Sequence, residues 1–199
     1  MINNQNRKIF EISGVKLSSV HSGMYNKKRL DLSIMEICKG AVVTGVFTKN
    51  KAKSDTITIS QKNLKKTTPK YIIVNSGNAN AGTGVDGYKD IMAYSNYLSK
   101  KSNCTSDKIL VFSTGVIGER IKVKNILNSI PKLLLNLKID NWLNFSKSIL
   151  TTDTTNKVVS IKVKIKNKYI NITGVTKGSG MINPNMATML SFVATDIKI

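Results

Sequence analysis

Two short apolar runs in this chain are each followed at once by a turn rich in glycine, and this pairing constrains the fold more than any other feature. The run "YIIVN" (71–75) leads into "NSGNANAGTGVDG" (75–87), and "ILVF" (109–112) leads into "STGVIGE" (113–119). Short apolar runs bounded by turn residues are typical of buried strands. Glycine and asparagine tolerate positive φ, so both turns can bend sharply before the next element begins. The sequence therefore predicts strand–turn–helix units.

Helical periodicity follows each of the two turns. The first helix should start near Asp86, and the second should continue until Pro131 divides it or opens a further helix. Residues spaced three and four apart would form one face of each helix. These are Tyr88, Ile91, Met92, Ser95 and Leu98 in the first helix, and Val123, Ile126, Leu127 and Ile130 in the second.

The remaining segments add strands and one helix. The run "AVVTGVF" (41–47) is expected to form another buried strand, and "DNWLNFSKSIL" (140–150) a helix with Asp140 as its N-cap. One side of this helix would be apolar: Trp142, Phe145 and Ile149. A hairpin is predicted around "KNK" (166–168), with lysines on its solvated face and strict apolar alternation on the other: Val159, Ile161, Val163 and Ile165. The fold class expected from this order is a layered α/β sandwich.

The composition is that of a globular protein kept in a reducing compartment. With 199 residues, 41% of them hydrophobic, the chain can bury a sizeable core as one domain or two small ones. Cys38 and Cys104 form no CxxC pair and His21 is the single histidine, which excludes a His/Cys metal site. The start "MINNQNRKIF" lacks the apolar stretch of a signal peptide, and no apolar run approaches the ~18 residues of a membrane span. We expect a cytoplasmic protein without a membrane partner.

The formal net charge of +20 makes nucleic acid the first candidate for a partner. Only Arg7, Arg29 and Arg120 among the 31 basic residues are arginine, whereas proteins that read bases favour arginine for its two-point contacts. The lysines are spread along the chain and often alternate with apolar residues. A nucleic-acid partner is therefore disfavoured, and a basic binding protein is kept as an alternative.

Nucleophilic catalysis in this chain would depend on threonine. The single histidine lies in a polar segment and leaves no Ser/His/Asp arrangement, while the 11 acidic residues are scattered. A threonine hydroxyl can be activated by its own α-amino group once the chain is cut before it. The segment "MINPNMATML" (181–190) follows the hinge "KGSG" and offers such a bond, with the small residue Ala187 before Thr188.

The turn after the second strand could stabilise a developing negative charge. Thr114 and Gly115 would lie at the end of that strand, where a backbone N–H and the threonine hydroxyl could form an oxyanion hole. From spacing alone, an ordinary tight turn is the favoured interpretation. The loop "NSGNANAGTG" (75–84) lacks both GxGxxG and the lysine of a P-loop, so phosphate binding is not indicated.

These segments together resemble the ornithine acetyltransferase family of arginine biosynthesis, whose members are glutamate N-acetyltransferases that cleave themselves at an Ala–Thr bond. The matching segments occur in the family's order and cover nearly the whole chain. They are "KRLDLSIM" (28–35), "GVFTKN" (45–50), "NSGNANAGTG" (75–84), "STGVIGE" (113–119), "LTTDTTNK" (150–157) and "KGSGMINPNMATML" (177–190).

The resemblance implies catalytic roles for particular residues. Thr188 would be the nucleophile, exposed as a new N-terminus by autocatalytic cleavage between Ala187 and Thr188. Thr114 and Gly115 would stabilise the oxyanion, which reverses the interpretation from spacing. The fold implied is the α/β sandwich of the self-processing acetyltransferases with an N-terminal threonine.

The resemblance also implies substrates. Acetyl would pass from N2-acetyl-L-ornithine to L-glutamate through an acetyl-threonine intermediate, with Thr151, Lys177 and Thr188 binding the substrate. Thr152, one position along, is the alternative to Thr151. No metal and no resident cofactor is implied, while acetyl-CoA would be a second acetyl donor in the bifunctional variant of the family.

Family precursors continue into a second chain of comparable size, which implies a truncated domain organisation for this sequence. Residues 1–187 would be the alpha chain and residues 188–199 the start of the beta chain. The remainder of the beta chain would be the partner in an alpha2beta2 heterotetramer. Two alternatives remain: a truncated remnant without enzymatic turnover, and the basic nucleic-acid-binding protein.

Overall fold

Two sheets and the helices around them form the part of the chain that this computed structural model describes, residues 8–178 and 189–198. The first sheet has the order β1 (Val15–Val20), β2 (Leu32–Ile37), β3 (Tyr71–Asn75) and β4 (Ile109–Ser113). The second sheet holds β5 (Lys157–Ile165), β6 (Lys168–Lys177) and β7 (Leu190–Thr195). The helices are α1 (Asp55–Lys66), α2 (Gly84–Lys101), α3 (Val123–Leu135) and α4 (Trp142–Ser148), with a 3-10 turn η1 (Ser106–Lys108).

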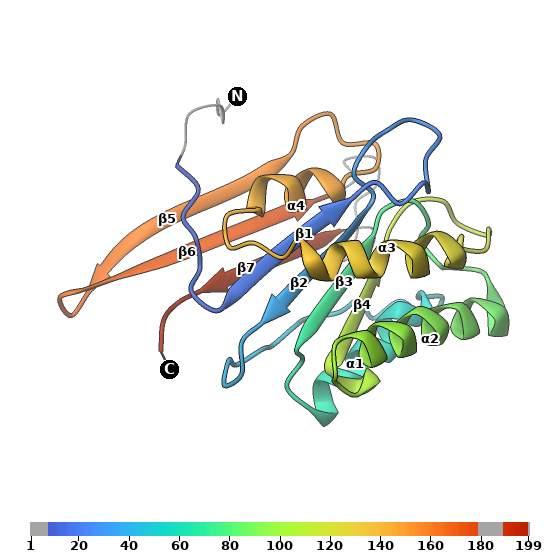
Figure 1. Cartoon of the computed structure of the whole chain (residues 1–199), viewed down its shortest axis with the longest axis horizontal. Coiled ribbons are helices and arrows are strands. Elements are labelled where there is room, and N and C mark those ends of the chain that lie inside the picture. Colours follow the sequence, from blue (N-terminus) through green and yellow to red (C-terminus); the bar gives the residue numbers. More distant parts are fainter. Residues whose placement is uncertain (1–7, 179–188, 199) are drawn as a thin grey trace.

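The two predicted apolar strands are confirmed and lie between two cores. All five residues of β3 are buried, and β3 pairs with β4 in parallel, whereas β1–β2 and β2–β3 are antiparallel. Since successive side chains of a strand point to opposite faces, Ile73 joins a core with α2 and α3. Ile72 and Val74 join a second core with α4, β6 and β7. The expected layered α/β sandwich is confirmed (Figure 1).

The predicted strand at 41–47 is wrong. This segment has no regular secondary structure, and Val42 and Val46 are 78% and 82% exposed. Ala41 and Val43 still pack against the second core, and the Phe47 ring is parallel to that of Phe112 at 6.3 Å between centroids. The segment therefore covers the core with alternate side chains but pairs with no strand among the described residues.

The predicted helices exist, with corrections to their ends and faces. Helix α2 begins at Gly84, and its buried face passes through Ile91, Tyr94 and Leu98, whereas Tyr88 is exposed. Helix α3 continues through Pro131, which is exposed, so the unpaired carbonyl of the preceding turn can reach water. No helix in the described ranges is both long and apolar enough to cross a membrane.

Helix α4 begins at Trp142, one residue later than expected for a helix whose N-cap is Asp140. Asn141, not Asp140, occupies the N-cap position, and its side chain makes no capping hydrogen bond. The predicted apolar side is confirmed by three fully buried residues: Trp142, Phe145 and Ile149.

The predicted hairpin is confirmed, but its apolar face points away from the molecule. Lys166 and Asn167 form the turn with φ of 44° and 63°. Val159 and Ile161 are about half exposed, at 53% and 48%. The opposite face holds Ser160 and Thr173, whose hydroxyls bond to the backbone of Phe10. The segment around Phe10 therefore covers this inner face of the hairpin, and its backbone is held there by hydrogen bonds with two hydroxyl groups.

Candidate active site

The parallel pairing of β3 and β4 brings the two glycine-rich turns together. Asn75 lies opposite Ser113 at the ends of these strands, and the Thr114 N–H donates to the Asn75 carbonyl at 3.0 Å. The Asn75 side chain bonds to Ser113 Oγ at 2.6 Å and accepts from the Asn78 N–H at 3.0 Å. Asn78 in turn bridges to the backbone of Thr114 and Val116. Asn75 and Asn78 therefore fix the positions of the two turns relative to one another.

Gly115 has a conformation that only glycine adopts without strain. Its φ is +125°, and a methyl group on its Cα would lie 2.6 Å from the Gly77 carbonyl carbon and 2.7 Å from the Ser76 carbonyl oxygen. The Gly115 N–H donates to no other residue within 8–178 and 189–198. The turn thus offers a backbone donor beside the Thr114 hydroxyl.

Lys177 joins three separate parts of the chain at one buried point. It is the last residue of β6 and only 2% exposed. Its Nζ donates to Thr114 Oγ1 at 3.1 Å and to Thr151 Oγ1 at 2.9 Å. Thr114 follows β4 and Thr151 lies in the turn between α4 and β5. A cation and two hydroxyls from distant segments therefore form one cluster.

Asp153 supplies a negative charge that acts on this lysine. Burial lowers the pKa of the Lys177 ammonium below its usual value, and the Asp153 carboxylate opposes part of that decrease. Burial also raises the pKa of the Asp153 carboxyl, but the Lys157 ammonium and the Gly178 N–H outweigh it, so this pKa is lowered overall. Lys157 Nζ donates to Asp153 Oδ1 at 2.9 Å, and the Gly178 N–H donates to the same oxygen at 3.4 Å.

Three of the predicted site residues are thus in one cluster: Thr114, Thr151 and Lys177. Thr152 is exposed, and it is the Thr151 hydroxyl that meets Lys177, which favours Thr151 over its neighbour. The scissile pair Ala187 and Thr188 lies outside the described residues.

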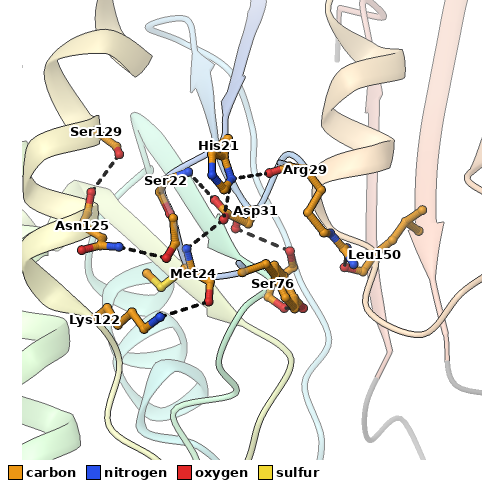
Figure 2. A network of polar contacts seen from close by, with 12 residues as sticks. His21, Ser22, Met24, Arg29, Asp31, Ser76, Lys122, Asn125, Ser129 and Leu150 are labelled. Carbon is orange, nitrogen blue, oxygen red and sulfur yellow. Dashed lines mark hydrogen bonds and ion pairs between the residues drawn. The ribbon is translucent and has the colours of Figure 1, made fainter. Parts of the chain in front are cut away.

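Sequence reasoning assigned no role to Asp153 or Arg29. Arg29 extends from the segment before β2 to the turn after α4, where its guanidinium donates to the carbonyls of Leu150 and Thr151 (Figure 2). Both residues occur in the quoted segments "LTTDTTNK" and "KRLDLSIM", and this is the only signal that could have pointed to them. Arg29 donates to two backbone carbonyls and Asp153 accepts from the Gly178 N–H, and no residue pattern encodes such contacts with backbone groups.

The cluster is suited to binding an oxygen that carries negative charge. An ammonium has three N–H donors, so two bonds to threonine hydroxyls leave Lys177 one donor for a ligand. Because Lys177 donates to Thr114 Oγ1, the hydroxyl hydrogen of Thr114 remains free to donate elsewhere. Within the described ranges, no group of three His, Cys, Asp or Glu side chains converges as metal ligands would.

Proteins of known sequence match nearly the whole of this chain. It is 42% identical over 191 residues to the arginine biosynthesis bifunctional protein ArgJ of Psychrobacter arcticus, a match that covers 96% of this chain and 47% of that protein. It is 41% identical over 199 residues to the protein of the same name from Colwellia psychrerythraea, covering 94% and 47%. The chain spans about half the length of the curated relatives it matches.

Two crystal structures share the fold. ArgJ of Bacillus halodurans has a TM-score of 0.80 at 33% identity, over 88% of this chain and 92% of that chain. The ornithine acetyltransferase of Mycobacterium tuberculosis in complex with ornithine has a TM-score of 0.81 at 26% identity, over 88% and 94%.

The α/β sandwich with a lysine–threonine cluster at the strand ends therefore has the fold class of these ArgJ-type structures. The chain belongs to the ArgJ family, whose family model matches residues 16–199.

Proposed function

We propose that this chain is the amino-terminal part of an acetyltransferase of arginine biosynthesis, which moves acetyl from N2-acetyl-L-ornithine to L-glutamate. The observation that carries the proposal is the convergence of Thr114 and Thr151 on Lys177 Nζ within an ArgJ-family fold. The names of the relatives refer to arginine biosynthesis, and one solved relative holds ornithine. The proposal explains why a buried lysine is placed between two hydroxyls.

In the proposed reaction, the Thr188 hydroxyl oxygen attacks the acetyl carbonyl carbon of acetylornithine, and the α-amino group of Thr188 accepts the hydroxyl proton. The oxyanion is stabilised by the free hydroxyl hydrogen of Thr114 and the Gly115 N–H. The C–N bond then breaks, and the amine of ornithine leaves with the proton. Glutamate completes the cycle when its amine attacks the acetyl-threonine ester and Thr188 regains its hydroxyl proton.

Lys177 and Thr151 would hold the substrate during both half-reactions, together with Thr188. The remaining N–H of the Lys177 ammonium is suited to a carboxylate, a group that acetylornithine and glutamate share. Threonine chemistry of this kind needs no resident cofactor. The curated relatives are named bifunctional, and in a bifunctional enzyme acetyl-CoA would act as an additional acetyl donor.

Autocatalytic cleavage between Ala187 and Thr188 would give an alpha chain of residues 1–187 and begin a beta chain at 188–199. The coverage figures support this division, because this chain spans 47% of a curated relative but 92% of a crystallised chain. A precursor that splits into two chains of similar size would produce that difference. We place the enzyme in the cytoplasm as an alpha2beta2 heterotetramer with the beta chain as partner.

The test combines mass spectrometry with an acetyl-transfer assay. The chain is co-expressed with the carboxy-terminal half of the Psychrobacter arcticus relative, and transfer of deuterated acetyl from acetylornithine to glutamate is followed. We expect transfer, and a fragment that ends at Ala187. The Thr188→Ala variant should stay uncut and inactive. A truncated remnant would give no transfer, and cleavage of Thr188→Ala at the same bond would refute the assignment of the nucleophile.

A further inference from the structure

The loop between β1 and β2 reaches the turn that carries Thr151. The Arg29 guanidinium donates through Nη1 to the Thr151 carbonyl at 3.3 Å and through Nη2 to the Leu150 carbonyl. Figure 2 shows this side chain crossing from its own segment to Leu150. The planar fork of arginine can hold two neighbouring acceptors at once, which an ammonium cannot do in the same geometry.

The turn held by Arg29 has little other backbone support. Residues 151–156 make no backbone–backbone hydrogen bond to any other residue in the described ranges. Thr151 is instead held at two points by cations, its carbonyl by Arg29 and its hydroxyl by Lys177. The position of the Thr151 hydroxyl therefore depends on side chains rather than on regular secondary structure.

The same loop also contacts the opposite side of the site. The Arg29 guanidinium lies over the Tyr25 ring, 4.3 Å from its centroid. Tyr25 Oη donates to the Ser76 carbonyl at 2.5 Å, and this carbonyl packs directly against Gly115. Tyr25 and Arg29, stacked on one another, thus connect the backbone beside Gly115 with the backbone of Thr151.

The loop that carries this pair is itself anchored. Asp31 is fully buried, and its carboxylate accepts from the Ser22 N–H at 2.6 Å and from the Met24 N–H at 3.0 Å. From α3 and the turn before it, Asn125 donates to the Gly23 carbonyl at 3.0 Å and Lys122 to that of Met24 at 3.4 Å (Figure 2). A rigid support of this kind is what a positioning residue requires.

We infer that Arg29 is a positioning residue that, with Tyr25, fixes the place of the Thr151 hydroxyl relative to Thr114 and Gly115. It acts through the backbone of the 150–151 turn and does not itself contact the reacting atoms. The effect on substrate binding rests on the proposed function, whereas the effect on the position of Thr151 does not.

The test uses NMR spectra of the chain with labelled threonine methyl groups, together with titration with N2-acetylornithine. Arg29→Lys keeps the positive charge but loses the fork, and Arg29→Gln loses both. We expect both variants to move the Thr151 methyl resonance and to weaken binding about tenfold, because a displaced Thr151 hydroxyl would lose roughly one hydrogen bond to the ligand. Tyr25→Phe, which keeps the ring but removes the hydroxyl, should move the Thr114 resonance more than that of Thr151.

Arg120 provides the matched control, because it also makes a two-point contact, to Asp90 at 3.0 and 2.6 Å, away from the cluster. Arg120→Gln should leave the Thr151 resonance and the affinity unchanged. Our inference is overturned if the Thr151 resonance stays in place in Arg29→Lys, the milder change, in a folded chain. If the unaltered chain binds no acetylornithine even when co-expressed with the carboxy-terminal half, the proposed function fails, and the methyl resonances alone decide the role of Arg29.

Discussion

Lys177 Nζ lies 2.9 Å from Thr151 Oγ1, although 26 positions of sequence separate the two residues. The β5–β6 hairpin accounts for this distance, since Thr151 lies in the turn before β5 and Lys177 ends β6. In its register Lys157 lies opposite Thr176, so the end of β6 returns to the start of β5. A slip of one residue would turn the Lys177 side chain to the outer face. The register of one hairpin therefore determines whether the cluster exists.

Replacing Lys177 by methionine should separate binding from stability. The variant removes the cost of burying an ammonium but leaves two threonine hydroxyls without its hydrogen bonds, so the free energy of unfolding should change by no more than about 1 kcal/mol. Affinity for N2-acetylornithine should fall at least about tenfold, because the charged donor is lost. Calorimetric titration and urea denaturation measure the two effects. Lys168→Met, an exposed change in the same strand, should alter neither.

Adding one methyl group at Gly115 should destabilise the fold strongly. At φ of +125° and with backbone atoms 2.6 to 2.8 Å from the new carbon, Gly115→Ala should lower the free energy of unfolding by about 3 kcal/mol. Gly118→Ala has a positive φ of +81° but open space around it, and should cost about 1 kcal/mol. Equal losses for the two variants in urea denaturation would contradict the close approach at Gly115.

The carboxyl of Asp153 should contribute a pH-dependent part of stability. Its pKa in the folded chain lies below the usual value of 3.8, so its contribution is present above about pH 4 and is lost as pH falls through the folded pKa. Asp153→Asn should therefore differ most from the unaltered chain at pH 6, and the difference should shrink progressively as pH falls below about 4, as measured by urea denaturation.

A second substitution checks the cause of that low pKa. The largest of the interactions that lower it is the hydrogen bond from Lys157, so Lys157→Met should raise the pKa of the Asp153 carboxyl in an NMR titration. An unchanged pKa would mean that the Gly178 N–H and the charge of Lys177 suffice.

Truncating two neighbouring residues of β7 should change the free energy of unfolding by very different amounts. The Phe192 ring meets those of Phe112 and Phe145 edge to face, each at 5.4 Å between centroids. Phe192→Ala should lower the free energy of unfolding by about 3 to 5 kcal/mol. Val193 is 69% exposed, and Val193→Ala should stay within about 0.5 kcal/mol. Thermal and urea unfolding would show the opposite order if the strand faced the other way.

The sequence predicted strands correctly where the apolar residues of the segment themselves indicate that it is buried. β3 and β4 are apolar up to their last residues, Asn75 and Ser113, and contribute side chains to both cores. The segment 41–47 is equally apolar, but local composition does not reveal whether a partner strand is available. In β5 the alternation showed that one face is apolar, not which face meets the molecule. That choice depends on Phe10, whose backbone bonds to Ser160 and Thr173.

The sequence likewise indicated some residues of the candidate site and missed others. Thr114, Thr151 and Lys177 were selected through resemblance, while their mutual contact depends on two turns and the end of β6, which approach one another only in the folded chain. Arg29 and Asp153 were missed because their contacts beside the cluster are with a backbone carbonyl and a backbone N–H, groups that almost every residue possesses. Periodicity encodes which face of an element is buried, but not which backbone groups a charged side chain meets.

The outward apolar face of β5 also governs how the chain behaves in solution. At low ionic strength, the net charge of +20 keeps molecules apart and offsets the attraction between exposed Val159 and Ile161 side chains. At about 0.15 M salt the Debye length shrinks to roughly 8 Å, so the repulsion is screened while the apolar contact persists. The colloidal stability of this chain should therefore decline as salt is added, and light scattering should show particle size increasing.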